Sequence, residues 1–236
     1  MSKNNYSVMI YRVIKYNLKI IFAGKFFWFM LASFSFFAFF MFQTAWNREE
    51  INEATIYNLL MFPCLLLIFY PIVFGIQNDE DNRILEIIFG IPNYRYKVWG
   101  VRMLMVYFAN YFIIVLFAWV GKYLLYPVNS FEMAAQLLFP MFFMGNLAFM
   151  FSTITRSGNG TAVIMIIIGL IFFIVGSSIS NSYWNIFINP FKIPSDVHPM
   201  IWANTLLKSR IFLAIAAIVW LMAGFLNLQK REKFMG

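Results

Sequence analysis

Six long apolar stretches dominate this sequence, and each is long enough to cross a membrane as an α-helix. They lie at Phe26–Ala45, Ile56–Ile76, Met103–Val120, Ala134–Ile154, Thr161–Ile179 and Ile211–Leu228. A hydrocarbon core about 30 Å thick is crossed by roughly 20 apolar residues of helix. Strands of a membrane barrel would instead alternate over about 10 residues. These stretches are apolar on every face, so they predict membrane-spanning helices.

The composition is typical of a membrane protein rather than a soluble domain. Hydrophobic residues make up 62% of the 236 residues and charged residues only 12%, whereas a soluble domain carries about 25% charged residues. The polar intervals are too short to hold a soluble domain, so we expect one transmembrane domain over residues 1–236. The single cysteine, Cys64, lies inside the second stretch, which leaves no disulfide framework and no thiol metal site.

The net charge of +8 is explained by the membrane topology. With the N-terminus placed in the cytoplasm, most of the 18 Lys and Arg residues fall on the cytoplasmic side, as the positive-inside rule requires. An even number of spans puts both termini on that side. We expect Lys208 and Arg210, on the outer side, to anchor the sixth span at the lipid headgroups. We expect no nucleic-acid partner, because retained cytoplasmic cations account for the charge.

The first 25 residues predict an amphipathic helix beside the first span. Apolar residues recur at helical spacing on one face, and Arg12, Lys15 and Lys19 lie on another. A basic amphipathic helix next to a span typically lies in the membrane interface. We therefore expect an elbow helix over residues 1–25, with a simple membrane anchor as the alternative. The run lacks the short apolar core and cleavage site of a signal peptide.

The sequence shows none of the motifs of a membrane enzyme or an ion-coupled transporter. No Asp, Glu, Lys, Arg or His lies within the six stretches, although such residues usually mark a proton or ion pathway. His198 is the only histidine, which excludes the paired histidines of a zinc protease helix. No Gly-x-Ser-x-Gly elbow and no phosphate-binding loop is present. We expect no enzymatic activity, metal or cofactor in this chain.

The interval between the second and third stretches is the most structured polar segment. It begins with acidic residues and Asn, which suit the N-terminus of a helix. A mostly apolar run, Ile84–Phe89, follows, and Gly90 and Pro92 end it. A cytoplasmic helix this apolar must bury its face. The surface that covers it is the membrane, the spans of the same chain, or a groove of a partner.

An ordered set of motif residues runs through this interval. It consists of Glu80, Glu86, Pro92, Arg95, Gly100 and Arg102. Their order resembles the type-2 permease family of ATP-binding-cassette exporters, whose pattern reads roughly E-x-x-x-G-T-x-E-x-L-x-x-x-P-[ST]-R, followed by G-K. Here Arg83-Ile84 stand where the family has Gly-Thr, and Val101-Arg102 where it has Lys.

The resemblance implies a fold and a set of partners. The fold is an all-α membrane protein of six transmembrane helices, with an N-terminal elbow helix and a cytoplasmic coupling helix within residues 78–98. In the family, that helix docks on a cytoplasmic ATPase dimer, which holds the ATP and Mg²⁺. A second permease half, identical or paralogous, completes the unit in the lipid of a bacterial inner membrane. The residues expected to couple to the ATPase are Glu80, Arg83, Glu86, Ile87, Ile88, Phe89, Pro92 and Arg95.

The outer segment before the sixth span is rich in aromatic residues and prolines. Its aromatic residues include Trp184, Phe187, Phe191 and Trp202, and aromatic side chains at this density favour the membrane interface. The resemblance implies that residues 180–207 form short re-entrant helices that gate the exit, with a plain loop as the alternative. Together these features predict the permease subunit of an exporter. The alternative is a membrane assembly or immunity factor that acts with a partner complex without transport.

Overall fold

The computed structural model describes residues 25–47, 51–81 and 95–229. These residues form helices joined by turns, with no strand among them. The helices are α2 (Phe26–Trp46), α3 (Glu53–Val73), α4 (Gly75–Asp81), the π-helix η1 (Arg95–Gly100), α6 (Val101–Leu124), α7 (Ser130–Thr155), α8 (Gly158–Ser178) and α9 (Pro199–Asn227). In the chain, α4 continues α3 after Phe74, and η1 leads directly into α6.

Six helical stretches are long and apolar enough to cross a membrane. They are Phe26–Trp46, Glu53–Asp81, Tyr96–Leu124, Ser130–Thr155, Gly158–Ser178 and Pro199–Asn227. The fold is therefore that of a multi-pass α-helical membrane protein, and the prediction of six spans is confirmed. The elbow helix predicted over residues 1–25 lies outside the described residues, except for Lys25.

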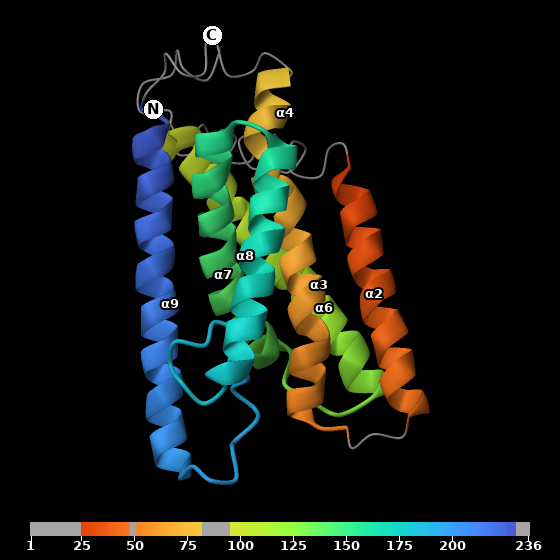
Figure 1. Ribbon diagram of the computed structural model, residues 1–236. Helices are drawn as coiled ribbons and strands as arrows, with labels where there is room; N and C mark the ends of the chain where they lie inside the picture. Colours follow the sequence, from red (N-terminus) through yellow and green to blue (C-terminus); the bar gives the residue numbers. More distant parts are fainter. Residues whose placement is uncertain (1–24, 48–50, 82–94, 230–236) are drawn as a thin grey trace, which may run out of the picture.

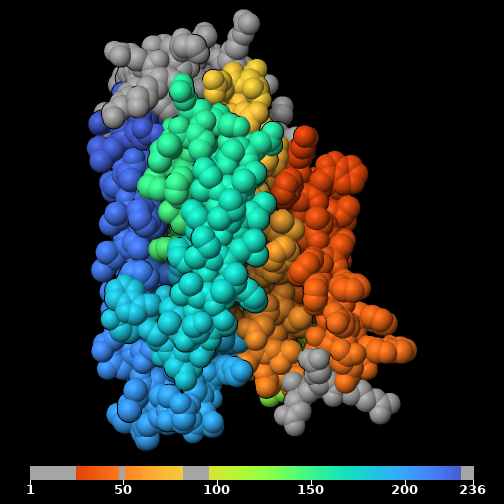
Figure 2. Space-filling view, in the orientation of Figure 1, coloured from red at the N-terminus to blue at the C-terminus, as the bar shows by residue number. Residues whose placement is uncertain are grey.

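The helices stand side by side in one bundle (Figure 1). Helix α7 packs against α3, α6, α8 and α9, whereas α2 packs mainly on α3 and α8 mainly on α7. Within its most apolar 18-residue window, 67% of α7 is buried, compared with 17% of α2 and 11% of α8. Helices α2 and α8 are thus the least enclosed spans, and Figure 2 shows the side chains of α8 at the front of one face.

The two ends of the bundle differ (Figure 1). Helix α4 and the start of α6 lie at one end, which we call the α4 end. The connections 125–129 and 179–198 lie at the opposite end, which we call the loop end. Because successive helices run in alternating directions, α2 begins and α9 ends at the α4 end.

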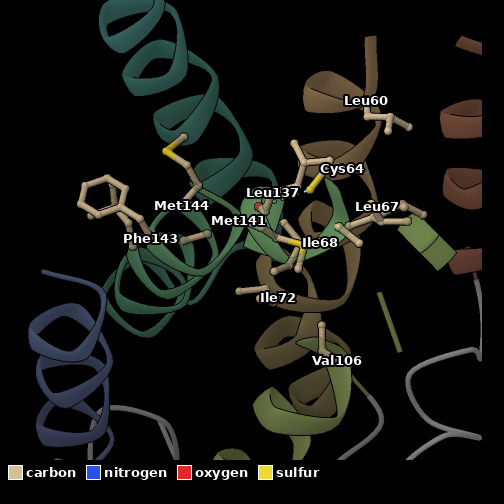
Figure 3. Close-up of a cluster of buried hydrophobic side chains, with 14 of the residues drawn as sticks. Leu60, Cys64, Leu67, Ile68, Ile72, Val106, Leu137, Met141, Phe143 and Met144 are labelled. Carbon is tan, nitrogen blue, oxygen red and sulfur yellow. Dashed lines mark hydrogen bonds between the residues drawn. The ribbon is translucent and has the colours of Figure 1, made fainter. Parts of the chain in front are cut away.

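Helices α3 and α7 face each other in the core. Leu60, Cys64 and Leu67 of α3 and Leu137 and Met141 of α7 are almost fully buried. They form one cluster with side chains of α6 (Figure 3). Between helices in a membrane, such packing stabilises the fold through close van der Waals contact. The core therefore fixes α3 and α7 as the frame on which the other spans are held.

Helix α9 begins earlier than the sequence predicts. The prediction began the sixth span at Ile211, but the helix begins at Pro199, and proline is favoured at the first helical position. The Nδ1 atom of His198 accepts a hydrogen bond from the Met200 N–H at 3.3 Å, which caps the helix. Residues 199–207 thus belong to α9, while residues 179–198 form turns rather than short helices.

Candidate functional site

The α4 end holds a buried ion pair. An Nη1–H of Arg102 donates a hydrogen bond to Oδ2 of Asp79 at 2.6 Å, and both side chains are buried. The Arg102 guanidinium also lies 4.5 Å from the centre of the Trp99 ring. No second ion pair occurs between residues of the described ranges. The pair joins α4 to the start of α6, so it links the two helices that flank residues 82–94.

Local sequence explains why Asp79 points inward. Ile76 and Asp79 are three residues apart in α4, so they share one helical face, and both are buried, whereas Glu80 and Asp81 are exposed. The sequence analysis singled out Glu80 and Arg102 but missed Asp79. The signal that could have found it is this spacing from Ile76, which continues the buried face of the second span.

Helix α4 is held from a second side by α8. The N–H of Gly158, the first residue of α8, donates a hydrogen bond to Oε1 of Gln77 at 2.6 Å. Gly158 has no side chain to keep the two helices apart: a Cβ atom there would collide with the ring of Phe74. Helix α4 is therefore fixed against both α6 and α8.

The residues predicted to couple to an ATPase fall mostly outside the described ranges. Glu80 is exposed on α4, and Arg95 begins η1. The remaining predicted coupling residues, Arg83, Glu86, Ile87, Ile88, Phe89 and Pro92, lie outside the described residues. The structure therefore places the two flanks of the predicted coupling segment, 78–81 and 95–98, and it adds a buried ion pair that joins Asp79 of the first flank to Arg102, just beyond the second.

An apolar groove of about 810 Å³ opens between the spans. Helices α2, α3, α7 and α8 contribute its walls, and Phe187 of the 179–198 segment contributes at the loop end. Of the side chains that line it, Asn58 is the only polar one. The groove is large enough for a drug-sized molecule, and its walls offer apolar contact rather than a set of hydrogen bonds.

The predicted gate residues do not form one cluster. Trp184 is exposed and its ring contacts Phe212 of α9, with ring centres 4.8 Å apart. Phe187 lines the groove, and Phe191 packs on Tyr57 of α3, with ring centres 5.8 Å apart. Trp202 was assigned to the outer segment, but it is buried on α9.

One asparagine ties the 179–198 segment to the first turns of α3, at the loop end. The Nδ2 atom of Asn189 donates hydrogen bonds to the Ala54 carbonyl at 2.8 Å and to Oδ1 of Asn58 at 2.9 Å. A side-chain amide supplies exactly these two donors. Together with the ring contacts to α3 and α9, this tie holds the segment across the loop end of the bundle.

Arg210 occupies a position that the sequence analysis did not expect. It was expected at the headgroups, but its side chain is buried, with 8% exposed, about three turns inside α9. Its Nε–H donates a hydrogen bond to Oε1 of Gln136 on α7 at 3.1 Å, and its guanidinium lies 5.1 Å from the centre of the Phe139 ring. The expectation failed because α9 extends well beyond the break in hydropathy at Lys208.

The charge of Arg210 has no carboxylate partner in the described ranges. Its Nη1 and Nη2 atoms are buried and have no hydrogen-bond acceptor there. The hydroxyl of Tyr57 lies beside the guanidinium, close enough for an electrostatic and a weak hydrogen-bonding interaction, although neither group reaches full hydrogen-bond geometry with the other. A charged residue inside a span that faces the bundle interior is usually functional, so Arg210 is a second candidate site.

The described residues provide no other obvious chemistry. No three His, Cys, Asp or Glu residues within the described ranges are placed to hold one metal ion. The thiol of Cys64 is buried, 3.9 Å from the Leu137 carbonyl. The candidate sites are thus the braced α4 end, the apolar groove and the buried Arg210.

Comparison with known proteins gives no further assignment. No model of a protein family, no curated protein and no solved structure matches this chain. The class defined by the fold is that of a multi-pass α-helical membrane protein, and a more specific function has to be argued from the sites themselves.

Proposed function

We propose that this chain is the membrane-spanning permease subunit of an ATP-binding-cassette exporter. It works with separate ATPase chains that hold the ATP and Mg²⁺, and with the α4 end in the cytoplasm of a bacterial cell. The observation that carries the proposal is the buried Asp79–Arg102 pair, which braces both flanks of the segment whose motif resembles the coupling helix of that family.

A coupling segment transmits force only if its attachments are stiff. Breaking a buried ion pair by removing one partner typically costs about 3–5 kcal/mol, because one charge is left uncompensated. The Asp79–Arg102 pair therefore resists separation of α4 and α6. The Gln77 bond to Gly158 extends the brace to α8. A displacement of residues 82–94 by an ATPase would be passed to three spans as a rigid-body motion.

The apolar groove supports a route for the exported molecule. Its walls include side chains of α2 and α8, the two spans with the least buried surface. In the proposed unit, a second permease half faces these spans, and an apolar or amphiphilic cargo passes along the walls of the groove. The 179–198 segment, which contributes Phe187 to the groove, would close the exit.

The first test of this proposal is the composition of the native complex. The tagged chain is purified from its own membrane in mild detergent, and the proteins that accompany it are identified by mass spectrometry. We expect a near-equimolar cytoplasmic ATPase with a phosphate-binding loop. Purification of an intact, folded chain without any such ATPase would contradict the proposal and favour an assembly or immunity factor.

A variant pair then tests the coupling segment directly. Glu86→Arg combined with Ile88→Asp reverses one charge and places a carboxylate on the expected docking face. We expect the ATPase to be lost from the purified complex. The matched control, Asp196→Arg combined with Ile193→Asp, makes an equivalent charge reversal and the same Ile-to-Asp change at exposed positions of the loop end, and it should retain the ATPase. Equal retention in both variants would show that residues 82–94 do not form the docking site.

A further inference from the structure

The buried Arg210 carries an inference that does not depend on any ATPase. We propose that Arg210 is the receptor for an anionic oxygen group, a carboxylate or a phosphate, on a ligand that enters from the loop end. The site is built from α9, α7 and α3, and Phe191 of the 179–198 segment packs on its Tyr57 wall. Loss of the transport proposal would leave this inference standing, because no step of it uses the α4 end.

The first step is the hydrogen-bonding state of the guanidinium. Arginine presents five N–H donors in a rigid fork and has no acceptor of its own. One donor, Nε–H, is used by Gln136. The Nη1 and Nη2 atoms, which carry the other four donors, have no partner at full hydrogen-bond geometry in the described ranges, and the one acceptor identified beside them is the neutral Tyr57 hydroxyl. Two adjacent donor nitrogens on one guanidinium match the two oxygens of a carboxylate or phosphate.

The second step is the charge of the surroundings. The groups that face Arg210 from α7 and α3 are a neutral amide, an aromatic ring and a phenol: Gln136, Phe139 and Tyr57. They position the guanidinium but leave its positive charge uncompensated. A buried charge is stable in a protein when it is paired and hydrogen-bonded. The arrangement is thus that of a positioned cation whose counter-charge comes from a bound group.

The third step is the path to the site. Arg210 lies about 16 Å along α9 from Pro199, at 1.5 Å per residue. Phe191 of the 179–198 segment packs on Tyr57, whose hydroxyl faces Arg210, and Trp184 packs on Phe212, two residues further along α9. The segment therefore contacts the Tyr57 wall of the site and, through Trp184, a different face of α9, because residues two apart on a helix do not share a face. Because it consists of turns held by a few contacts, its displacement would uncover Tyr57, the proposed entry to the site, without separating the packed spans.

Two sources of the anionic group are distinguished by the probes. The full-length chain is purified in a neutral detergent. One arm measures binding of phosphatidylglycerol against zwitterionic phosphatidylcholine by native mass spectrometry. The other arm measures the shift of the thermal unfolding midpoint with inorganic phosphate against sodium chloride at equal ionic strength. Binding in the first arm identifies a lipid headgroup, and binding in the second identifies a free oxyanion.

The variants assign the binding to this side chain. Arg210→Gln should weaken whichever probe binds by roughly 30-fold or more, the cost expected when one partner of a buried, hydrogen-bonded charge pair is removed. Lys208→Gln is the matched control: it removes the same charge two residues away from an exposed side chain, and it should bind as the unaltered chain does. Arg210→Lys keeps the charge but loses the fork, so it should bind more weakly than the unaltered chain.

A purely structural role for Arg210 predicts a different pattern. If Arg210→Gln fails to fold, Arg210→Met replaces the charge by an apolar side chain of similar length. We expect Arg210→Met to be at least as heat-stable as the unaltered chain without probe, yet to lose the probe-dependent shift. If the folded Arg210 variant binds a probe as tightly as the unaltered chain does, the proposal is overturned. Failure of both probes to bind the unaltered chain saturably would overturn it as well.

Discussion

Two arginines are buried to a similar degree at opposite ends of this bundle, with 5% of Arg102 and 8% of Arg210 exposed. Arg102 meets the carboxylate of Asp79 at 2.6 Å. Arg210 meets a neutral amide and the face of a phenyl ring. Each also has an aromatic neighbour, so the difference between them is the counter-charge.

This difference separates a brace from a receptor. A compensated pair fixes the helices that carry it, because separating the charges inside a membrane protein is costly. An uncompensated cation fixes little, but it provides strong attraction for an anion that reaches it. The α4 end thus has the properties of a rigid connection, and the loop end has those of the proposed anion receptor. The three predictions below test this contrast.

The largest effect is expected when the same substitution is made at both arginines. Arg102→Met leaves the Asp79 carboxylate buried without a partner, which should lower the free energy of unfolding by about 3–5 kcal/mol. Arg210→Met leaves no charge behind, so stability should be unchanged or higher. The free energy of unfolding in mixed detergent micelles measures both. Equal losses would show that the two arginines play the same structural part.

A double substitution controls this comparison. Asp79→Leu combined with Arg102→Met removes both charges at once, and replacing a buried pair by apolar residues is often neutral or stabilising. The double variant should therefore recover most of the stability lost in Arg102→Met. If it remains as unstable as the single variant, packing around Trp99 rather than charge accounts for the loss.

A smaller effect is expected from the packing that supports the brace. Phe149 of α7 lies with its ring centre 6.0 Å from that of Trp99, and a Cβ at Gly224 of α9 would lie 2.7 Å from two atoms of the Phe149 ring. Gly224→Ala should therefore cost about 1–3 kcal/mol through overpacking, measured in the same micelles.

Gly169 of α8 provides the matched control. An added Cβ there would meet only the Met144 methyl carbon, at an ordinary 3.9 Å. Gly169→Ala should leave stability unchanged or raise it by up to about 1 kcal/mol, because alanine favours the helix over glycine. If Gly169→Ala lowers the free energy of unfolding as much as Gly224→Ala does, α8 is packed as tightly as α9. That result would contradict the description of α8 as a peripheral span.

The number of spans could be predicted from the sequence because apolar length alone determines it. The two buried arginines could not, because each depends on which residues of other helices lie opposite. The apolar run predicts that the second span ends at Ile76, so Asp79 falls outside it. In the structure, α4 continues the same buried face through Asp79. The apolar run likewise predicts that the sixth span begins at Ile211, after the charged residues Lys208 and Arg210.

A helical pattern that runs across Lys208 and Arg210 could have predicted the earlier start of α9. Trp202, Ser209, Leu213 and Ala217 are spaced by seven and then four residues, and all four are buried on α9. Such spacing keeps one face in register across the charged residues. It predicts that the helix continues through Arg210, with Arg210 next to the buried face. The partners Gln136 and Phe139 become visible only once α7 is placed beside α9.

The smallest effect is expected at the cover of the loop end. Asn189→Ala removes two hydrogen bonds, to the Ala54 carbonyl and to the Asn58 side chain. A net loss of about 1–2 kcal/mol is expected for two such bonds, and it should appear as local opening rather than global unfolding. Amide hydrogen exchange of residues 179–198 should speed up about 5- to 30-fold, with exchange in α7 unchanged.

Asn181→Ala, at an exposed position of the same segment, is the control and should leave the exchange rate of the segment as it is. Exchange in Asn189→Ala that rises equally in α7 would mean that the segment is part of the packed core, and that Arg210 is sealed in by the whole bundle rather than by a cover of turns.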